Sequence, residues 1–216
     1  MARMLGLAAA LLALGATAPA ALAQATPPLP ATRDYTATYR VSGVNDQTVD
    51  VKLFWNAALK RQRVEPQLPD APAAMGGMAM IMDQAAGTMI MLQPSQRMAM
   101  EMPVGAQGGA SGPDMQSMLD PSKYRFERTG ADRVLNQPCT VWRFSEKSGA
   151  ANGTACITGD GVMLRTETTH QGRPTRMEAV AVSLTAQPAS LFEVPADYQR
   201  MQMPGAGQGG RPPRRQ

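Results

Sequence analysis

Apolar and polar residues alternate with a period of two through most of the chain between residues 35 and 184. This is the period of a half-buried β-strand, because successive side chains of a strand point to opposite faces. Six strands are expected in the first half, at residues 35–42, 48–55, 60–65, 78–82, 88–92 and 97–102. The third alternates charged residues with Gln62 and Val64 and stops at Pro66, which is typical of a solvent-facing or edge strand.

Five more strands are expected in the second half, at residues 123–128, 139–144, 154–158, 162–169 and 175–184. Short turns separate them, and Asp160-Gly161 is the strongest of these turn signals. Between the halves, residues 104–113 are rich in Gly, Ala and Ser, and residues 114–119 could form one or two helical turns behind Asp114 as N-cap. Neither half has enough strands to bury a face alone, so we expect a single, mainly antiparallel β domain over residues 35–203.

The two ends of the chain differ from this pattern. Arg3, the apolar run 5–14 and the triplet Ala21-Leu22-Ala23 have the order of a secretory signal peptide, which predicts cleavage after Ala23 and a periplasmic location. Residues 24–34 form a Pro-rich extended linker and residues 204–216 a Gly/Pro/Arg tail, and we expect both to be disordered. No later run is long enough for a membrane helix, so the processed protein is not expected to be integral to the membrane.

Charge and motif content narrow the classes of function. The net charge is +4, but three of the positive residues lie in the tail, so the charge does not indicate nucleic-acid binding. No nucleophile elbow, zinc-protease motif, Walker loop or dinucleotide fingerprint occurs, and His170 is the single histidine. We therefore expect neither an enzyme nor a bound cofactor.

The two cysteines, Cys139 and Cys156, are expected to form a disulfide, because an even pair in an exported chain is first interpreted that way. If they lie directly opposite each other on neighbouring strands, the hairpin loop falls at residues 146–149, where the turn residues also place it. The same register puts Trp142 and Phe144 on the face shared by Ala155 and Ile157, and the Asp160-Gly161 turn pairs Ile157 with Leu164 on that face. One wall of the core is thus expected to contain Trp142, Phe144, Ile157 and Leu164.

Methionines are concentrated in the middle of the chain, where 11 of the 17 lie between Met75 and Met118. In residues 97–102 they alternate with Arg97, Ala99 and Glu101, so one face of that strand is lined with methionine. Pairing across the two hairpin loops predicts two rows of three thioethers: Met80, Met91 and Met98, and Met82, Met89 and Met100.

Three interpretations of these methionines remain open. They could fill an irregular core, since methionine is an adaptable filler, or line a cavity for an apolar molecule such as a lipid or acyl chain. In the second case the wall of Trp142, Phe144, Ile157 and Leu164 completes the apolar interior. The third interpretation is a Cu(I) site, because thioethers are soft ligands. Its expected ligands are Met80, Met89, Met91 and Met98.

Four segments carry a resemblance to known families: MIMDQAAGTMIMLQPSQRMAMEMP, PCTVWRF, ACITGDGVMLR and LFEVPADYQRM. They resemble an uncharacterised family of secreted Gram-negative proteins, a domain of unknown function, over about residues 35 to 203. The strand order and closing segment are also similar to the periplasmic lipoprotein carriers of the LolA/LolB type. That similarity implies an open, incomplete antiparallel β-barrel with one or two short helices over an apolar cavity that accepts acyl chains. The Met-rich strands and the disulfide depart from the carriers.

The sequence thus predicts a non-enzymatic periplasmic binding protein that holds an apolar ligand in a Met-rich cavity. A Met-rich Cu(I)-binding protein is the first alternative. The second is an assembly or interaction factor without a small ligand, which would bind another envelope protein through an exposed strand edge.

Overall fold

The computed structural model describes residues 26–44, 47–67, 77–103, 122–149, 151–170 and 172–202. The expected signal peptide, the helical segment at 114–119 and the tail from residue 204 lie outside these residues. In the part of the chain that is described, no helix has the length and apolar character needed to span a membrane.

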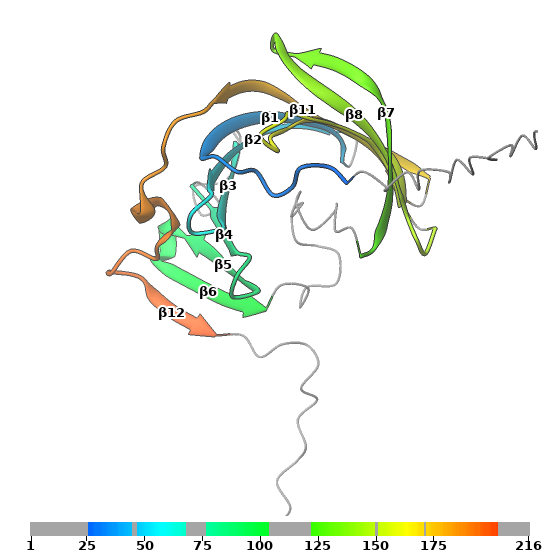
Figure 1. Ribbon diagram of the computed structural model, residues 1–216. Helices are drawn as coiled ribbons and strands as arrows, with labels where there is room; N and C mark the ends of the chain where they lie inside the picture. The colour runs from blue at the N-terminus through cyan, green and yellow to red at the C-terminus, as the bar shows by residue number, and fades with distance from the viewer. Residues whose placement is uncertain are drawn as a thin grey trace, which may run out of the picture.

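The described residues form one 12-stranded sheet (Figure 1). Its strands are β1 (Tyr35–Val44), β2 (Gln47–Asn56), β3 (Arg61–Gln67), β4 (Ala79–Asp83), β5 (Thr88–Gln93), β6 (Met98–Pro103), β7 (Tyr124–Val134), β8 (Gln137–Glu146), β9 (Ala151–Ile157), β10 (Met163–His170), β11 (Arg173–Ser183) and β12 (Gln199–Gln202). Their spatial order is β12-β6-β5-β4-β3-β2-β1-β11-β10-β9-β8-β7. Both halves of the chain are therefore one unit, joined where β1 pairs with β11.

The sheet curves into an open arc, and its two outermost strands, β7 and β12, do not pair with each other (Figure 1). All neighbours are antiparallel except β12 and β6, which are parallel. Among the described residues the helical elements are two short 3-10 turns, η1 (Pro94–Gln96) and η3 (Ala189–Phe192). The expectation of a mainly β, open and incomplete antiparallel barrel is confirmed.

The segment between β11 and β12 covers the outer face of β3 to β6. In Figure 1 this segment, with η3, lies outside the arc. Phe192, only 1% exposed, packs against a small outward-facing cluster: Ala79, Ile81, Leu92 and Ala99. The Arg63 guanidinium donates to the Leu191 carbonyl at 3.0 Å and the Asn56 amide to the Gln187 carbonyl at 2.9 Å. Because side chains alternate along a strand, the residues between these outward-facing ones point into the arc.

Residues 26–34 were expected to be part of a disordered linker, and the structure differs. Ala31 is buried, and its carbonyl accepts a hydrogen bond of 2.9 Å from the Trp55 indole N–H. The Thr32 amide donates to the Asp160 carbonyl at 2.9 Å, which ties this segment to the turn before β10. Gly161 is required there, since a Cβ would lie 2.2 Å from the Pro28 carbonyl oxygen. Burial of apolar side chains and satisfied polar groups hold a segment whose composition alone indicates disorder.

Strand β3 is central, not the edge or solvent-facing strand that its charges and Pro66 suggested. It pairs with β2 on one side and β4 on the other. Its charged residues lie on the outer face, where Arg61 pairs with Asp83 at 2.8 Å and Arg63 with Glu65 at 2.7 Å. Gln62 and Val64 are buried between them. Pro66 is accommodated near the end of the strand, where a lost backbone donor costs little.

Cys139 and Cys156 form the expected disulfide, with a Cα–Cα distance of 5.4 Å. They are not directly opposite, however, because Cys156 pairs with Val141 and the true register of β8 and β9 differs by two residues. A two-residue shift keeps every side chain on its face. Trp142 therefore still shares a face with Ala155 as expected, and the two sulfurs lie on the other face.

An ion pair spans the disulfide on that outer face. Asp132 of β7 is the register partner of Cys139, and Arg165 of β10 is the partner of Cys156. The two side chains meet across the intervening strands at 2.5 Å. The hydrogen bond from Arg165 lowers the pKa of Asp132, which keeps this carboxylate charged.

Candidate functional site

The methionines of β4, β5 and β6 share one face of the sheet. They alternate with Ala79, Ile81, Leu92 and Ala99, which contact Phe192 outside the arc. The strand register places Met80 opposite Met91 and Met82 opposite Met89, as the sequence predicted. All of these thioethers therefore point towards the inside of the arc.

The predicted pairing of β5 with β6 is wrong by two residues. Met91 lies opposite Met100, and Met89 opposite Met102, so the observed rows are Met80–Met91–Met100 and Met82–Met89–Met102. The cause is the connecting turn, in which η1 and Arg97, in the left-handed region at φ 49°, make Gln93 the partner of Met98. Met98 keeps the predicted face, but it lies opposite Gln93 and not opposite Met91.

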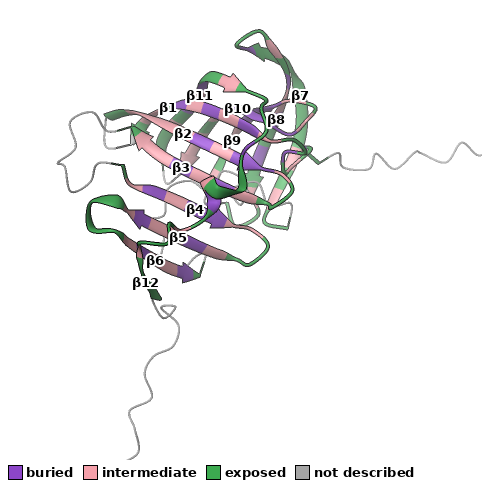
Figure 2. Cartoon of the chain, turned by 90° about the vertical axis from the view of Figure 1, so that its left-hand side faces the viewer, coloured by how far each residue is buried: buried purple, intermediate pink, exposed green. Residues whose placement is uncertain are grey.

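The two rows differ in burial. Met82, Met89 and Met102 are at most 5% exposed and belong to the main core. Met80, Met91 and Met100 are half-buried. Buried and half-buried residues accordingly mix along β4 to β6 (Figure 2). The first row thus continues the core, whereas the second offers a flexible, partly accessible apolar surface.

The predicted wall of Trp142, Phe144, Ile157 and Leu164, called the apolar wall below, belongs to the same core as the methionines. Trp142, Phe144, Ile157 and Leu164 are all buried in the cluster that contains Met82 and Met89. Leu164 does not pair with Ile157 as expected. Met163 takes that place, and Leu164 lies in a β-bulge between Met163 and Arg165.

Gly153 leaves space for the Phe144 ring of the apolar wall. It lies opposite Phe144 in the register of β8 and β9. A Cβ on this glycine would lie 2.9 Å from the Phe144 ring and 2.1 Å from the backbone oxygen of Glu167. The Phe144 ring also makes an edge-on contact with Tyr124, with ring centroids 5.8 Å apart. The wall is thus positioned by close packing that a larger residue in β9 would disrupt.

Most polar groups on the inner face are satisfied within the protein. The Tyr39 hydroxyl donates to the Met163 carbonyl at 2.8 Å, and the Trp55 indole to Ala31. Burial raises the pKa of Tyr35 to about 12 and also raises the pKa of Tyr39, whose neighbour Tyr35 adds to the effect. Both phenols are therefore neutral at ordinary pH and act as structural groups.

Two inner-face side chains have no such partner. Among the described residues, the buried side-chain atoms without a hydrogen bond are both polar atoms of Gln62 and the Trp142 indole nitrogen. Gln62 is 0% exposed. A buried polar group left unpaired costs about 1–3 kcal/mol, so such groups are rare unless they have a use. The burial of Gln62 was not predicted from the sequence, because a polar residue between two arginines in a strand indicates exposure. The available signal was the apolar Val64, which lies two residues further along the same strand and therefore on the same face.

The described residues contain no group of three or more His, Cys, Asp or Glu side chains arranged to hold a metal ion. Both cysteines are in the disulfide, so neither offers a thiolate. The soft ligands that the described residues offer to copper are therefore the thioethers of methionine.

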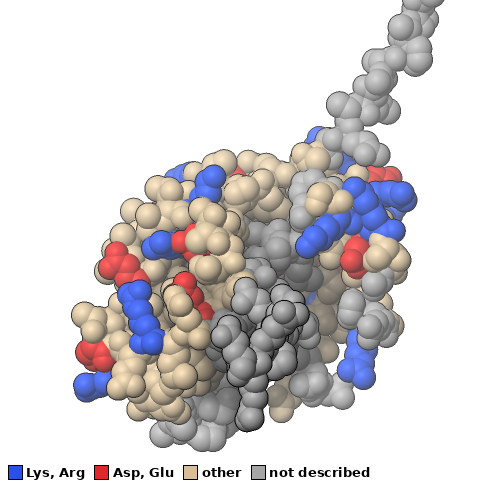
Figure 3. All heavy atoms as spheres, turned by 90° about the horizontal axis from the view of Figure 1, so that it is seen from below, with Lys and Arg blue, Asp and Glu red and all other residues tan. Residues whose placement is uncertain are grey.

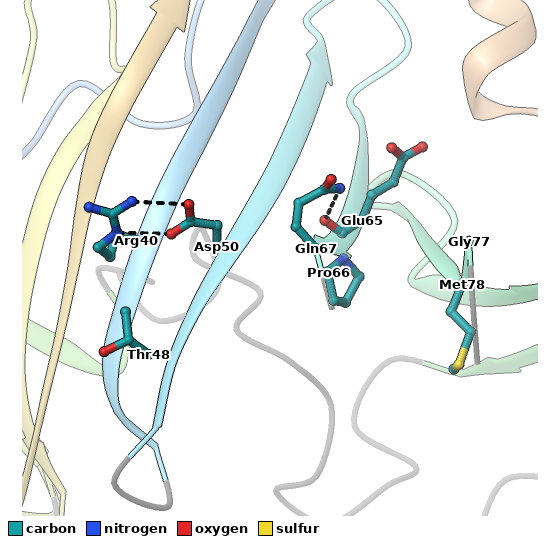
Figure 4. A pocket seen from close by; sticks show the side chains of 8 residues that line it. All are labelled: Arg40, Thr48, Asp50, Glu65, Pro66, Gln67, Gly77 and Met78. Carbon is teal, nitrogen blue, oxygen red and sulfur yellow. Dashed lines mark hydrogen bonds and ion pairs between the residues drawn. The ribbon is translucent and has the colours of Figure 1, made fainter. Parts of the chain in front are cut away.

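A pocket of about 710 Å³ lies at the end of β1 to β4 (Figure 4). Its lining residues are Arg40, Thr48, Asp50, Glu65, Pro66, Gln67, Gly77 and Met78. Arg40 and Asp50 form a two-pronged pair at 3.0 and 3.2 Å, so both charges are already used. None of the residues predicted for the site lines this pocket. Its lining mixes charged and polar side chains with Pro66 and Met78, and so differs in kind from the methionine face.

Basic side chains gather over the side of the molecule where β7 and β8 lie (Figure 3). Edge strand β7 and the residue before it contribute Lys123, Arg125, Arg128 and Arg133, all exposed. Glu127 pairs with Arg143 of β8 and Asp132 with Arg165. Counting the described residues alone, the acids of this strand are thus paired, whereas several of its cations form no ion pair.

Residues 43–160 match the profile of a protein family described as a domain of unknown function, DUF4412. The chain belongs to this family. The matched segment contains all six predicted methionines, Gln62 and the disulfide, so these features lie within the DUF4412 region. No curated protein matches the chain.

Several solved structures have a similar fold. An uncharacterized conserved protein from Thermus thermophilus has 13% sequence identity and a TM-score of 0.53, over 80% of this chain and 91% of that one. MucB, with 13% identity and a TM-score of 0.50, matches over 78% of this chain and 59% of its own length. A putative outer membrane lipoprotein-sorting protein domain from Vibrio parahaemolyticus has 14% identity and a TM-score of 0.38, over 74% and 89%. At these identities the likeness concerns the fold, and this DUF4412 protein spans just over half of MucB.

Proposed function

We propose that this protein is a non-enzymatic periplasmic binding protein that holds an apolar molecule, a lipid or an acyl chain, against the inner face of its curved sheet. The observation that carries the proposal is that the methionines of β4 to β6 all point into the arc. The signal-peptide pattern ending at Ala23 supports the location.

The chemistry of this face suits a shape-tolerant apolar ligand. Methionine is unbranched and polarizable, so a half-buried row of thioethers can adjust to chains of different shape. The ligand-binding set would be Met80, Met82, Met89, Met91, Met98 and Met100 with Trp142, Phe144, Ile157 and Leu164.

The test is native mass spectrometry of protein purified from the bacterial envelope, combined with titration of a fluorescent fatty acid. We expect copurified lipid and saturable probe binding. Met100→Lys should weaken probe binding by at least about tenfold, because an ammonium group disfavours an apolar site. Glu101→Lys is the matched control, since Glu101 neighbours Met100 in β6, is also half-buried and lies on the outer face. Apo protein alone, with no probe binding, rules the proposal out.

A second candidate function is docking to another envelope protein at strand β7. This strand has 11 residues, is exposed along nearly its whole length and ends the sheet (Figure 2). Such an edge can accept a strand from a partner, and its basic side chains favour an acidic one. Arg125→Glu with Arg128→Glu should then abolish copurification of a partner while fatty-acid binding persists; unchanged copurification contradicts this function.

A further inference from the structure

Gln62 offers a hydrogen-bonding position in the middle of the apolar inner face. Its register partners are Trp55 on β2 and Met82 on β4, both buried in the main core. Directly paired residues of neighbouring strands share a face, so the carboxamide lies on the methionine side of the sheet.

The neighbours cannot satisfy this carboxamide. The Trp55 indole already donates to the Ala31 carbonyl, and the Met82 sulfur is only a weak acceptor. Within the described part of the chain, both Nε2 and Oε1 of Gln62 are buried without a partner. On the same strand, the exposed Gln67 donates from its side chain to the Glu65 carbonyl at 3.2 Å, so the other glutamine of β3 does have a partner.

We propose that Gln62 is the polar anchor of the ligand site and that the ligand is an acyl chain with an amide at its head. This inference rests on the proposed function. A carboxamide presents one acceptor and two donors, so its best complement is a group that carries both an acceptor and a donor. A primary amide carries its carbonyl and one N–H on the same side, so it accepts from Nε2 and donates to Oε1 at once. An ester satisfies only Nε2, and a hydrocarbon satisfies neither atom.

A ligand can reach Gln62 only if a methionine side chain beside it moves. The Gln62 side chain is 0% exposed, so a ligand head reaches it only when a neighbour such as Met82 changes rotamer. Methionine has the side-chain flexibility for this movement. A polar group that can select the head of the ligand thus lies beneath flexible methionine side chains. This arrangement favours acyl chains with an amide head over hydrocarbons without a polar group.

The test compares three probes with equal numbers of heavy atoms, pentadecanamide, methyl tetradecanoate and heptadecane, by displacement of a fluorescent fatty acid from the full-length processed protein. Each hydrogen bond gained should tighten binding by about fivefold, so we expect the order amide, ester, hydrocarbon. In Gln62→Met, a variant of similar volume, the order should reverse, because the amide head then has no partner in an apolar site. Gln67→Met is the matched control and should retain the full series.

The outcomes separate the two proposals. Equal binding of all three probes to the wild type overturns the anchor and leaves the apolar site in place. Binding of none of them overturns both. Stability is an independent readout that needs no ligand: Gln62→Met should raise the midpoint of thermal unfolding, because it removes an unpaired buried amide. A lower midpoint, together with an unchanged probe series, shows that Gln62 is structural and contradicts the inference.

Discussion

Replacing both cysteines, as Cys139→Ala with Cys156→Ala, should destabilise the protein by about 3 kcal/mol. The two residues are 17 positions apart, and the loop-closure entropy of a cross-link of this span gives about this value at 25 °C. The Cα atoms are 5.4 Å apart on paired strands, within the usual range for a disulfide. The sheet can thus keep its register without the bond. The loss of stability should come from the unfolded chain, which is less restricted without the cross-link.

The assay is equilibrium unfolding in urea, followed by tryptophan fluorescence. The variant should unfold at lower urea with an equal or larger m-value, because the unfolded chain is no longer cross-linked and exposes more surface. Wild type measured in a reducing agent should match the variant, which separates loss of the bond from loss of the sulfur atoms. A loss below about 1 kcal/mol, or an unchanged wild type under reduction, would refute the reasoning.

The same variant also bears on the site. The sulfurs lie on the outer face, opposite to Trp142 and Phe144. Affinity for a fatty-acid probe in the absence of denaturant should therefore stay within about twofold of wild type. A large loss of binding with the fold intact would place the disulfide in the ligand site and contradict the face assignment.

Three further predictions concern packing and pH. Gly153→Ala should lower stability by at least about 1–3 kcal/mol, because its Cβ would meet backbone of β10, whereas Gly130→Ala, with open space around the Cβ, should be nearly neutral in thermal unfolding. Tyr35 and Tyr39 have raised pKa values, so the stability they contribute is full below pH 10 and is lost as the pH rises towards 12. Ultraviolet titration should show neither phenolate before the protein unfolds. Ionisation of either tyrosine in the folded protein near pH 10 contradicts their burial. Burial opposes a lower pKa at Asp83, but hydrogen bonds from Ala86 and Arg61 outweigh it, so the pKa of this carboxyl is lowered. The stability that Asp83 contributes is therefore present above about pH 4 and lost on further acidification. Asp83→Asn should reduce the fall in unfolding free energy below pH 4, and an unchanged fall contradicts the shift.

Alternation along the strands was sufficient to assign the faces of β4, β5 and β8. It could not set the register of the hairpins, because a shift by two residues preserves every face. At β5 and β6 the register depends on the left-handed conformation of Arg97, and at β8 and β9 on the length of the turn after Glu146. Pattern alone does not reveal either.

Contacts distant in sequence account for what was missed. Residues 26–34 are held by Trp55 and Asp160, and β12 pairs with β6 from the far end of the chain. The burial of β3 depends on pairing partners on both sides and on outward-facing ion pairs. The unpaired carboxamide of Gln62 could be recognised only when its strand was known to be central.

A ligand bound as proposed lies against the methionine face inside the arc. Methyl NMR of protein labelled at methionine, isoleucine and leucine methyl groups, titrated with lauric acid, tests this placement residue by residue. Large shift changes are expected for Met80, Met91 and Met100, and small ones for Ile81 and Leu92 on the outer face. Equal changes on both faces, or none at saturating lauric acid, would contradict it.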